Sequence, residues 1–123
     1  MILCHIGLAH EWDAAAEFGL YDRSTYRTSL SEVGFIHSSD SHEQAGRVAR
    51  YLYREVEVPL VLLEFTSEAL VDAGLRVLFE PASPDNPASE KFPHIYGGPI
   101  PVSVVSDVRR FDTVTELIDF CER

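Results

Sequence analysis

Residues 60–65, Leu-Val-Leu-Leu-Glu-Phe, form the strongest buried-strand signal in this chain of 123 residues. Short apolar runs of this length are typical of strands that are covered on both faces. Pro59 lies directly before the run and separates it from a helix expected upstream, because proline interrupts helical hydrogen bonding. The fold must therefore supply apolar partners on both sides of residues 60–65.

Segments with the apolar spacing of one helix face predict helices on either side of this strand. Ser, Thr and Gly residues at their ends are typical capping and termination signals. The expected helix starts are Ser41, Ser67 and Thr113, and the expected helix ends include Gly19 and Gly74. Further strands are expected at residues 1–6, 33–38, 75–80 and 102–108. We interpret residues 1–123 as one α+β domain, because strands and helices alternate irregularly and no linker divides the chain.

Two segments lack a helical or strand period. Residues 20–32 are polar and are expected to be irregular. Residues 81–91 carry three prolines together with Asp85 and Asn86, which predicts a surface loop. Because this loop precedes the Phe92-Pro93-His94 stretch, we expect it to lie beside a binding cleft and to be mobile, either as a lid or as a simply disordered segment.

Charge and cysteine content restrict the classes of function. The chain has 20 Asp and Glu against 10 Lys and Arg, a formal net charge of −10. This field repels phosphate backbones and anionic lipid, so general nucleic-acid binding and membrane-surface binding are not expected. The two cysteines are too few for a disulfide scaffold, and no apolar run is long enough to span a membrane. We therefore expect a cytoplasmic protein with a small-molecule ligand.

Three of the five histidines lie inside apolar or aromatic stretches. Alternate residues of a strand share a face, so His5, His37 and His94 would converge on one cleft if their strands are neighbours. The alternative is three separate core histidines, each bonded to a backbone carbonyl or a hydroxyl. His10 and His42 are expected to be ordinary surface residues. A three-histidine metal site is a further alternative, but no metal is expected because no common zinc motif occurs.

The stretch Phe92-Pro93-His94-Ile95-Tyr96-Gly97-Gly98-Pro99 has an unusual composition. Phe92 and Tyr96 offer stacking faces, and Gly97 allows close backbone approach to a ligand. A rigid structural turn is the competing interpretation. The chain lacks the glycine-rich loops of Rossmann and P-loop nucleotide sites, and it lacks the Gly-x-Ser-x-Gly nucleophile motif.

Two motifs, Gly34-Phe35-Ile36-His37-Ser38-Ser39 and Phe92-Pro93-His94-Ile95-Tyr96-Gly97, resemble the DUF 952 family. The resemblance extends from His5 to about Phe111 and includes Trp12, Leu62-Leu63-Glu64 and the Arg76–Glu80 stretch. It implies a fold related to the ADP-ribosyltransferase superfamily, a split mixed β-sheet with flanking helices and a cleft that binds NAD in relatives.

Site residues follow from this resemblance by position. His5, His37 and His94 would take the catalytic roles, with Tyr96 as an alternative to His94 in the third. Tyr96, Phe92, Gly97 and Ser38 would contact the ligand. Protein ADP-ribosylation is not expected, because the stretch around His94 contains no glutamate. The expected function is binding or processing of NAD or a related nucleotide, as a transferase or glycohydrolase. The alternative is a non-catalytic ligand-binding or protein-interaction domain that keeps the cleft.

Overall fold

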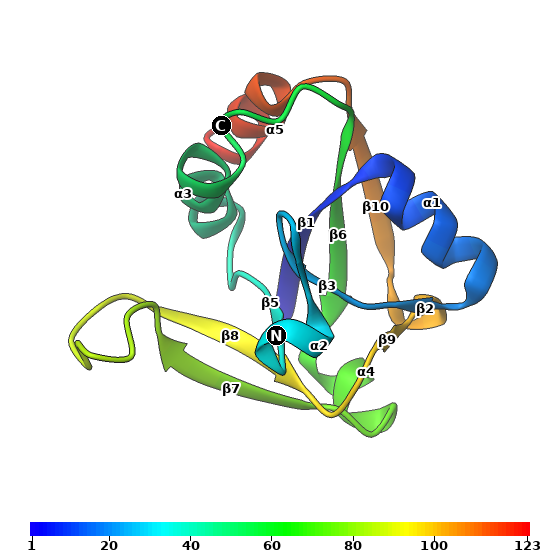
Figure 1. Ribbon diagram of the computed structural model, residues 1–123, viewed down its shortest axis with the longest axis vertical. Coiled ribbons are helices and arrows are strands. Elements are labelled where there is room, and N and C mark those ends of the chain that lie inside the picture. The colour runs from blue at the N-terminus through cyan, green and yellow to red at the C-terminus, as the bar shows by residue number, and fades with distance from the viewer.

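Two three-stranded sheets form the framework of the protein, and the computed structural model describes all of residues 1–123 (Figure 1). The sheets have the strand orders β1-β6-β10 and β5-β8-β7. An isolated bridge between Cys4 and Ser39 connects β1 of the first sheet to the chain just after β5 of the second. The strands are β1 (Ile2–Leu8), β6 (Leu60–Thr66), β10 (Asp107–Phe111), β5 (Ile36–His37), β8 (Lys91–Tyr96) and β7 (Arg76–Pro81).

Short strand pairs and five helices complete this α+β domain. β2 (Leu20–Tyr21) pairs with β9 (Ile100–Pro101), and β3 (Arg23–Thr25) pairs with β4 (Thr28–Ser29). The helices are α1 (Ala9–Phe18), α2 (Leu30–Val33), α3 (His42–Leu52), α4 (Ser67–Asp72) and α5 (Val114–Cys121), and Val102–Val104 form a 3-10 turn, η1. None of these helices combines the length and the apolar character that a membrane crossing requires.

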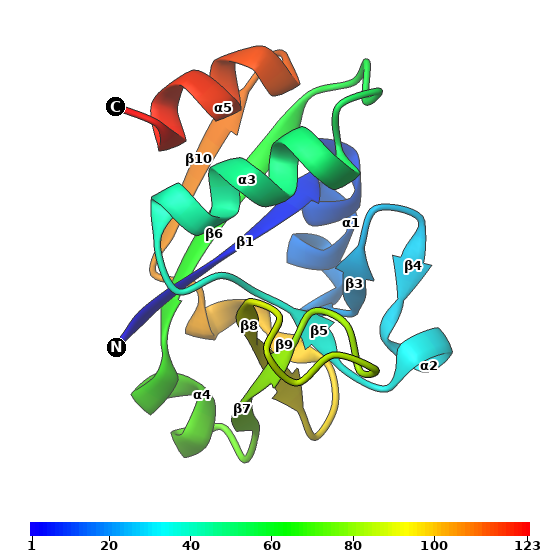
Figure 2. The same ribbon diagram turned by 90° about the vertical axis from the view of Figure 1, so that its left-hand side faces the viewer.

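Strand β6 lies in the middle of the first sheet and is covered on both faces, as the sequence predicts. Leu60 and Leu62 pack in an apolar cluster with α3 and α5, whereas Val61, Leu63 and Phe65 pack in a second cluster with α1. Figure 2 shows α3 in front of this sheet and α1 behind it. Each fully buried side chain of this size contributes about 1.5–3 kcal/mol to stability. Burial of this strand therefore holds the helices against both faces of the first sheet.

Capping residues position most helix ends where the sequence places them. The hydroxyls of Ser41 and Thr113 accept hydrogen bonds from the N–H three residues onward, at 3.0 and 3.2 Å. Gly19 follows α1 with a φ of 103°, a left-handed conformation that glycine adopts easily. The start expected at Ser67 is wrong by one residue, because the cap of α4 is Thr66.

The strand expected at residues 102–108 is also wrong. Val102–Val104 form η1, and the strand that pairs with β6 is Asp107–Phe111. Val102 and Val104 pack against the second apolar cluster from this turn. Their apolar character reflects this burial and does not indicate an extended backbone.

The first part of residues 20–38 contains more regular structure than the sequence predicts, and the last part contains less. The part expected to be irregular holds β2, the β3–β4 hairpin and α2. The strand expected at 33–38 is limited to Ile36–His37, because Gly34, with a φ of 86°, ends α2 just before it. These elements are too short to show a periodic apolar pattern.

The sheets are split, but every strand pairing is antiparallel, so the expected mixed sheet is wrong. Apolar runs show that a strand is buried but carry no information on the direction of its neighbour.

Candidate functional site

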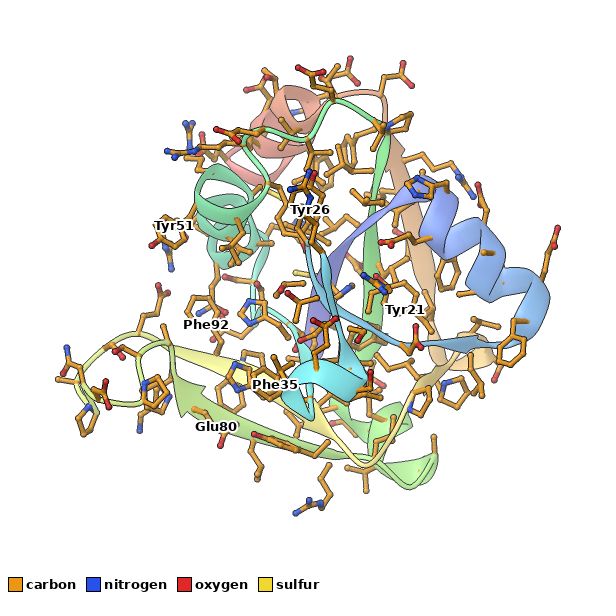
Figure 3. The ribbon with its side chains drawn as sticks, in the orientation of Figure 1. Tyr21, Tyr26, Phe35, Tyr51, Glu80 and Phe92 are labelled. Atoms are coloured by element: carbon orange, nitrogen blue, oxygen red, sulfur yellow. The ribbon has the colours of Figure 1, made fainter.

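A cavity of about 480 Å³ opens between the second sheet, the β3–β4 hairpin and helix α3. Figure 3 shows Phe35 and Phe92 at the sheet and Tyr51 on the helix. Its remaining walls come from the end of α2 and from the connection between β7 and β8. The lining residues are Ser24, Thr25, Thr28, Val33, Phe35, His37, Arg47, Val48, Tyr51, Leu52, Ala82, Glu90, Phe92 and His94.

The pairing of β5 with β8 brings two predicted histidines together. His37 lies directly opposite His94 in the ladder, so both side chains point to the same face of the sheet, and their ring centroids are 5.6 Å apart. Phe35 stacks on His94 at 4.0 Å with an interplanar angle of 15°, and Phe92 lies 4.9 Å from His37. The cavity therefore has a floor of four planar rings.

His37 is unusual because neither of its ring nitrogens makes a hydrogen bond within the protein, and Nε2 is shielded from solvent. Burial lowers the pKa of His37 to about 3, and the nearby His5 and His94 add to the effect because two imidazolium charges repel. His37 is therefore neutral near pH 7, with one nitrogen as a donor and one as an acceptor. Because Nε2 is shielded, a ligand in the cavity can reach only Nδ1, which also lacks a partner but is not shielded in the same way.

His94 belongs to a hydrogen-bonded group with Glu80 and Tyr96. Oε1 of Glu80 accepts hydrogen bonds from Nδ1 of His94, at 2.9 Å, and from the Tyr96 hydroxyl. The bond from Tyr96, and then that from His94, lowers the pKa of Glu80. The same contact raises the pKa of Tyr96 to about 12. Glu80 is thus held as a carboxylate beside the cavity.

The sequence interpretation missed Glu80 because it lies on β7, far from His94 along the chain. The signal that reveals it is the hairpin register. The turn between β7 and β8 pairs Glu80 with Phe92 and Leu78 with His94. If residues 81–91 connect the two strands of one hairpin, the carboxylate of Glu80 must lie close to His94.

His5 lies close to the cavity but does not line it. It is 3% exposed, and its Nδ1 lies 2.6 Å from the His37 carbonyl oxygen. Because a carbonyl oxygen only accepts, Nδ1 donates this bond, and Nε2 accepts one from the Tyr21 hydroxyl at 2.8 Å. Burial lowers the pKa of His5 to about 4. Both nitrogens are thus engaged, which leaves no ring nitrogen of His5 for a metal, and no group of three His, Cys, Asp or Glu is placed to hold one.

The other predicted ligand contacts differ in position. Phe92 lines the cavity. Tyr96 does not line it, but its hydroxyl donates a hydrogen bond to Glu80 beside the cavity. The Ser38 hydroxyl is buried and donates to the Pro93 carbonyl at 2.7 Å, which ties β5 to β8. Gly97 has a φ of 117°, and a Cβ there would lie 3.2 Å from Leu75, so its conformation is structural. Ser38 and Gly97 do not line the cavity.

The charges at the cavity rim cancel. Arg47, on α3, forms an ion pair with Glu90, and Gln44 donates to Glu90 at 3.1 Å and to the Lys91 carbonyl at 2.9 Å. The contact between Arg47 and Glu90 raises the pKa of Arg47 and lowers that of Glu90. It also attaches the end of the β7–β8 connection to the helix. The lining therefore presents aromatic and hydroxyl groups and the neutral imidazole of His37.

Comparison with known families agrees with the two sequence motifs at this site. A family model described as "Protein of unknown function (DUF952)" matches residues 6–108. The chain belongs to the DUF952 family. His37 and His94 lie within the matched DUF952 segment, whereas His5 stands one residue before it.

Solved structures similar to this DUF952 protein include CC0527 from Caulobacter crescentus. Its crystal structure has 31% sequence identity and a TM-score of 0.67, and the match covers 91% of this chain and 85% of that chain. Its solution NMR structure has 32% identity and a TM-score of 0.64, with 90% and 83% covered. A search of curated proteins found no match.

Proposed function

We propose that the cavity binds the planar, uncharged ring of a small ligand, such as the nicotinamide or base portion of NAD or a related nucleotide. The observation that carries this proposal is the neutral His37 ring, which lies among aromatic side chains without a hydrogen-bond partner. An amide or ring N–H of the ligand would bond to Nδ1 of His37, in the tautomer in which this nitrogen is the acceptor. Phe35, Phe92 and Tyr51 would supply the stacking and apolar contacts.

The size and charge of the cavity support a ring of this kind. A volume of about 480 Å³ lies within the usual range for small-molecule sites. Arg47 is already neutralised by Glu90, so the lining offers no free cation for a pyrophosphate. In a dinucleotide, we expect the ring to enter the cavity and the phosphates to remain at its mouth.

Catalysis on NAD, as a transferase or glycohydrolase in an ADP-ribosyltransferase-like fold, is the second candidate, and Glu80 is the observation that favours it. An ionised carboxylate can stabilise the positive charge that develops on a ribose when its bond to nicotinamide breaks. His37, with a pKa of about 3, is a poor proton acceptor at neutral pH. The binding role therefore rests on His37, and a catalytic role would rest on Glu80 with His94 and Tyr96.

Titration of the labelled protein with NAD, nicotinamide and adenosine, followed by NMR, tests the binding proposal. We expect ligand to shift the signals of Phe35, Phe92 and His94. In His37→Leu, which loses the hydrogen bond but has an apolar side chain, we expect the binding affinity to fall at least about tenfold. His10→Leu is the matched control, because His10 is exposed on α1 away from the cavity. Absence of shifts at millimolar ligand, or equal shifts in His37→Leu, would show that the proposal is wrong.

Release of nicotinamide from NAD tests the catalytic candidate separately. If the protein turns NAD over, Glu80→Gln should abolish turnover while ligand shifts remain. If ligand binds and no nicotinamide is released, the protein is a binding domain.

A further inference from the structure

The outer edge of β7 carries free backbone hydrogen-bonding groups. β7 is the last strand of the second sheet, and Figure 1 shows no element on its outer side. The Ala82 N–H donates to the Glu90 carbonyl at 2.8 Å, in the same register as the β7–β8 ladder. Hydrogen-bonded and non-hydrogen-bonded pairs alternate in antiparallel sheets, so Val77 and Phe79 turn their N–H and C=O groups away from β8. No other group in the protein bonds to them.

This edge is also apolar. Leu78 is 42% exposed and Phe79 is 43% exposed. Exposed edge strands are usually protected by proline, by repelling charges or by a covering element, because they can pair with another strand. Pro81 ends the strand but leaves Leu78 and Phe79 exposed. The edge has the properties of a surface that another strand covers.

The charges on β7 are arranged symmetrically about Leu78. Arg76 precedes it by two residues and Glu80 follows it by two. If a second β7 lies antiparallel with Leu78 opposite Leu78, each Arg76 lies opposite a Glu80 of the other copy. In this register Val77 lies opposite Phe79, and these are the residues whose backbone groups are free. The charge pattern and the hydrogen-bonding pattern therefore select the same register.

Glu80 can accept this contact without losing its own partners. Both hydrogen bonds from His94 and Tyr96 end on Oε1, so Oε2 has no hydrogen-bond partner in the protein. Opposite residues in non-hydrogen-bonded antiparallel pairs have Cα atoms about 4.5 Å apart, which allows an arginine and a carboxylate to meet. Arg76 lies over the Tyr96 ring on this same face.

We propose that two copies of this chain associate through β7, antiparallel and in register about Leu78, so that their second sheets join into one six-stranded sheet. The interface is isologous, with four backbone hydrogen bonds, two Arg76–Glu80 ion pairs and a Leu78–Leu78 contact on the two-fold axis. The proposal rests on the edge of β7 and not on the proposed ligand of the cavity.

Sedimentation equilibrium over a wide range of protein concentration tests the proposal. We expect the mass to rise from that of one chain to that of two. Leu78→Lys should keep the protein monomeric, because it places two positive charges on the two-fold axis. Val71→Lys is the matched control, since Val71 is 59% exposed on α4 and outside the edge, and it should dimerise as the wild type does. A wild type that stays monomeric throughout, or a Leu78→Lys variant that dimerises normally, overturns the proposal.

Two further measurements test the register and remain available if Leu78→Lys does not fold. Amide exchange at Val77 and Phe79 should slow as concentration rises, whereas the Leu78 amide, already facing β8, should not change. Arg76→Glu should weaken association at least about tenfold, and adding Glu80→Arg should restore it, because the exchanged charges again lie opposite each other. Protection of Leu78 alone, or equal association in all variants, contradicts this register.

Discussion

Replacement of Gly7 by alanine tests the buried contact between Tyr21 and His5. A Cβ at position 7 would lie 2.6 Å from the Tyr21 hydroxyl oxygen, closer than real Cβ atoms approach other heavy atoms. Tyr21 is only 1% exposed, so its ring has little room to move. Displacement of the hydroxyl also breaks its 2.8 Å hydrogen bond to Nε2 of His5. Glycine at position 7 is therefore required for this bond.

The expected cost follows from these contacts. Overpacking costs about 1–3 kcal/mol, and a buried acceptor left without its donor costs about 1–3 kcal/mol. The lower entropy of alanine in the unfolded chain offsets about 0.4–1 kcal/mol. We expect Gly7→Ala to lower the free energy of unfolding by about 2–4 kcal/mol, which corresponds to a fall in Tm of roughly 6–16 °C for a domain of this size.

Urea unfolding of a double-mutant cycle measures this coupling. Tyr21→Phe alone removes the hydroxyl and should cost about 1–2 kcal/mol, because His5 loses its donor. In Gly7→Ala/Tyr21→Phe the atom that the new Cβ meets is gone, and the ring carbon at 3.5 Å is an ordinary contact. The double variant should therefore be more stable than the sum of the single changes by about 1–3 kcal/mol. Wild-type stability of Gly7→Ala, or strict additivity, would refute the reasoning.

Three other predictions follow from burial and loop structure. Stability should fall as the pH drops below about 6.5, because the unfolded chain takes up protons at His5 and His37, whereas their folded pKa values are about 4 and about 3. Each histidine contributes a slope of about 1.4 kcal/mol per pH unit, so urea unfolding between neutral and mildly acidic pH should show a smaller slope in His37→Leu. Cys4 and Cys121 are buried, and burial raises their pKa to about 12 and about 11, so neither should react with a thiol reagent until the protein unfolds. Rapid labelling of the folded protein would contradict this. Residues 82–90, which form turns between β7 and β8, should exchange amide hydrogens faster than β6, and a cavity ligand should slow this exchange if the loop acts as a lid. Equal exchange rates with and without ligand would show that it does not.

The sequence alone determined the parts of this protein that depend on neighbouring residues. The run at 60–65 showed a strand buried on both faces, and the Ser41 and Thr113 caps located two helices. Strand alternation placed His94 and Tyr96 on one face of β8, where both side chains bond to Glu80. These features are local, because strand alternation, helix periodicity and capping bonds all act within a few residues.

Tertiary structure decided which distant residues meet. Only the β5–β8 register places His37 opposite His94, and only the β7–β8 hairpin brings Glu80 to His94. His5 lies in an apolar setting like that of the other two histidines. Tyr21, which packs in the space left by Gly7, bonds to the His5 ring and holds it away from the cavity. Strand direction and register depend on contacts between segments far apart in the chain. An apolar pattern indicates that a strand is buried, but it does not show which strand pairs with it.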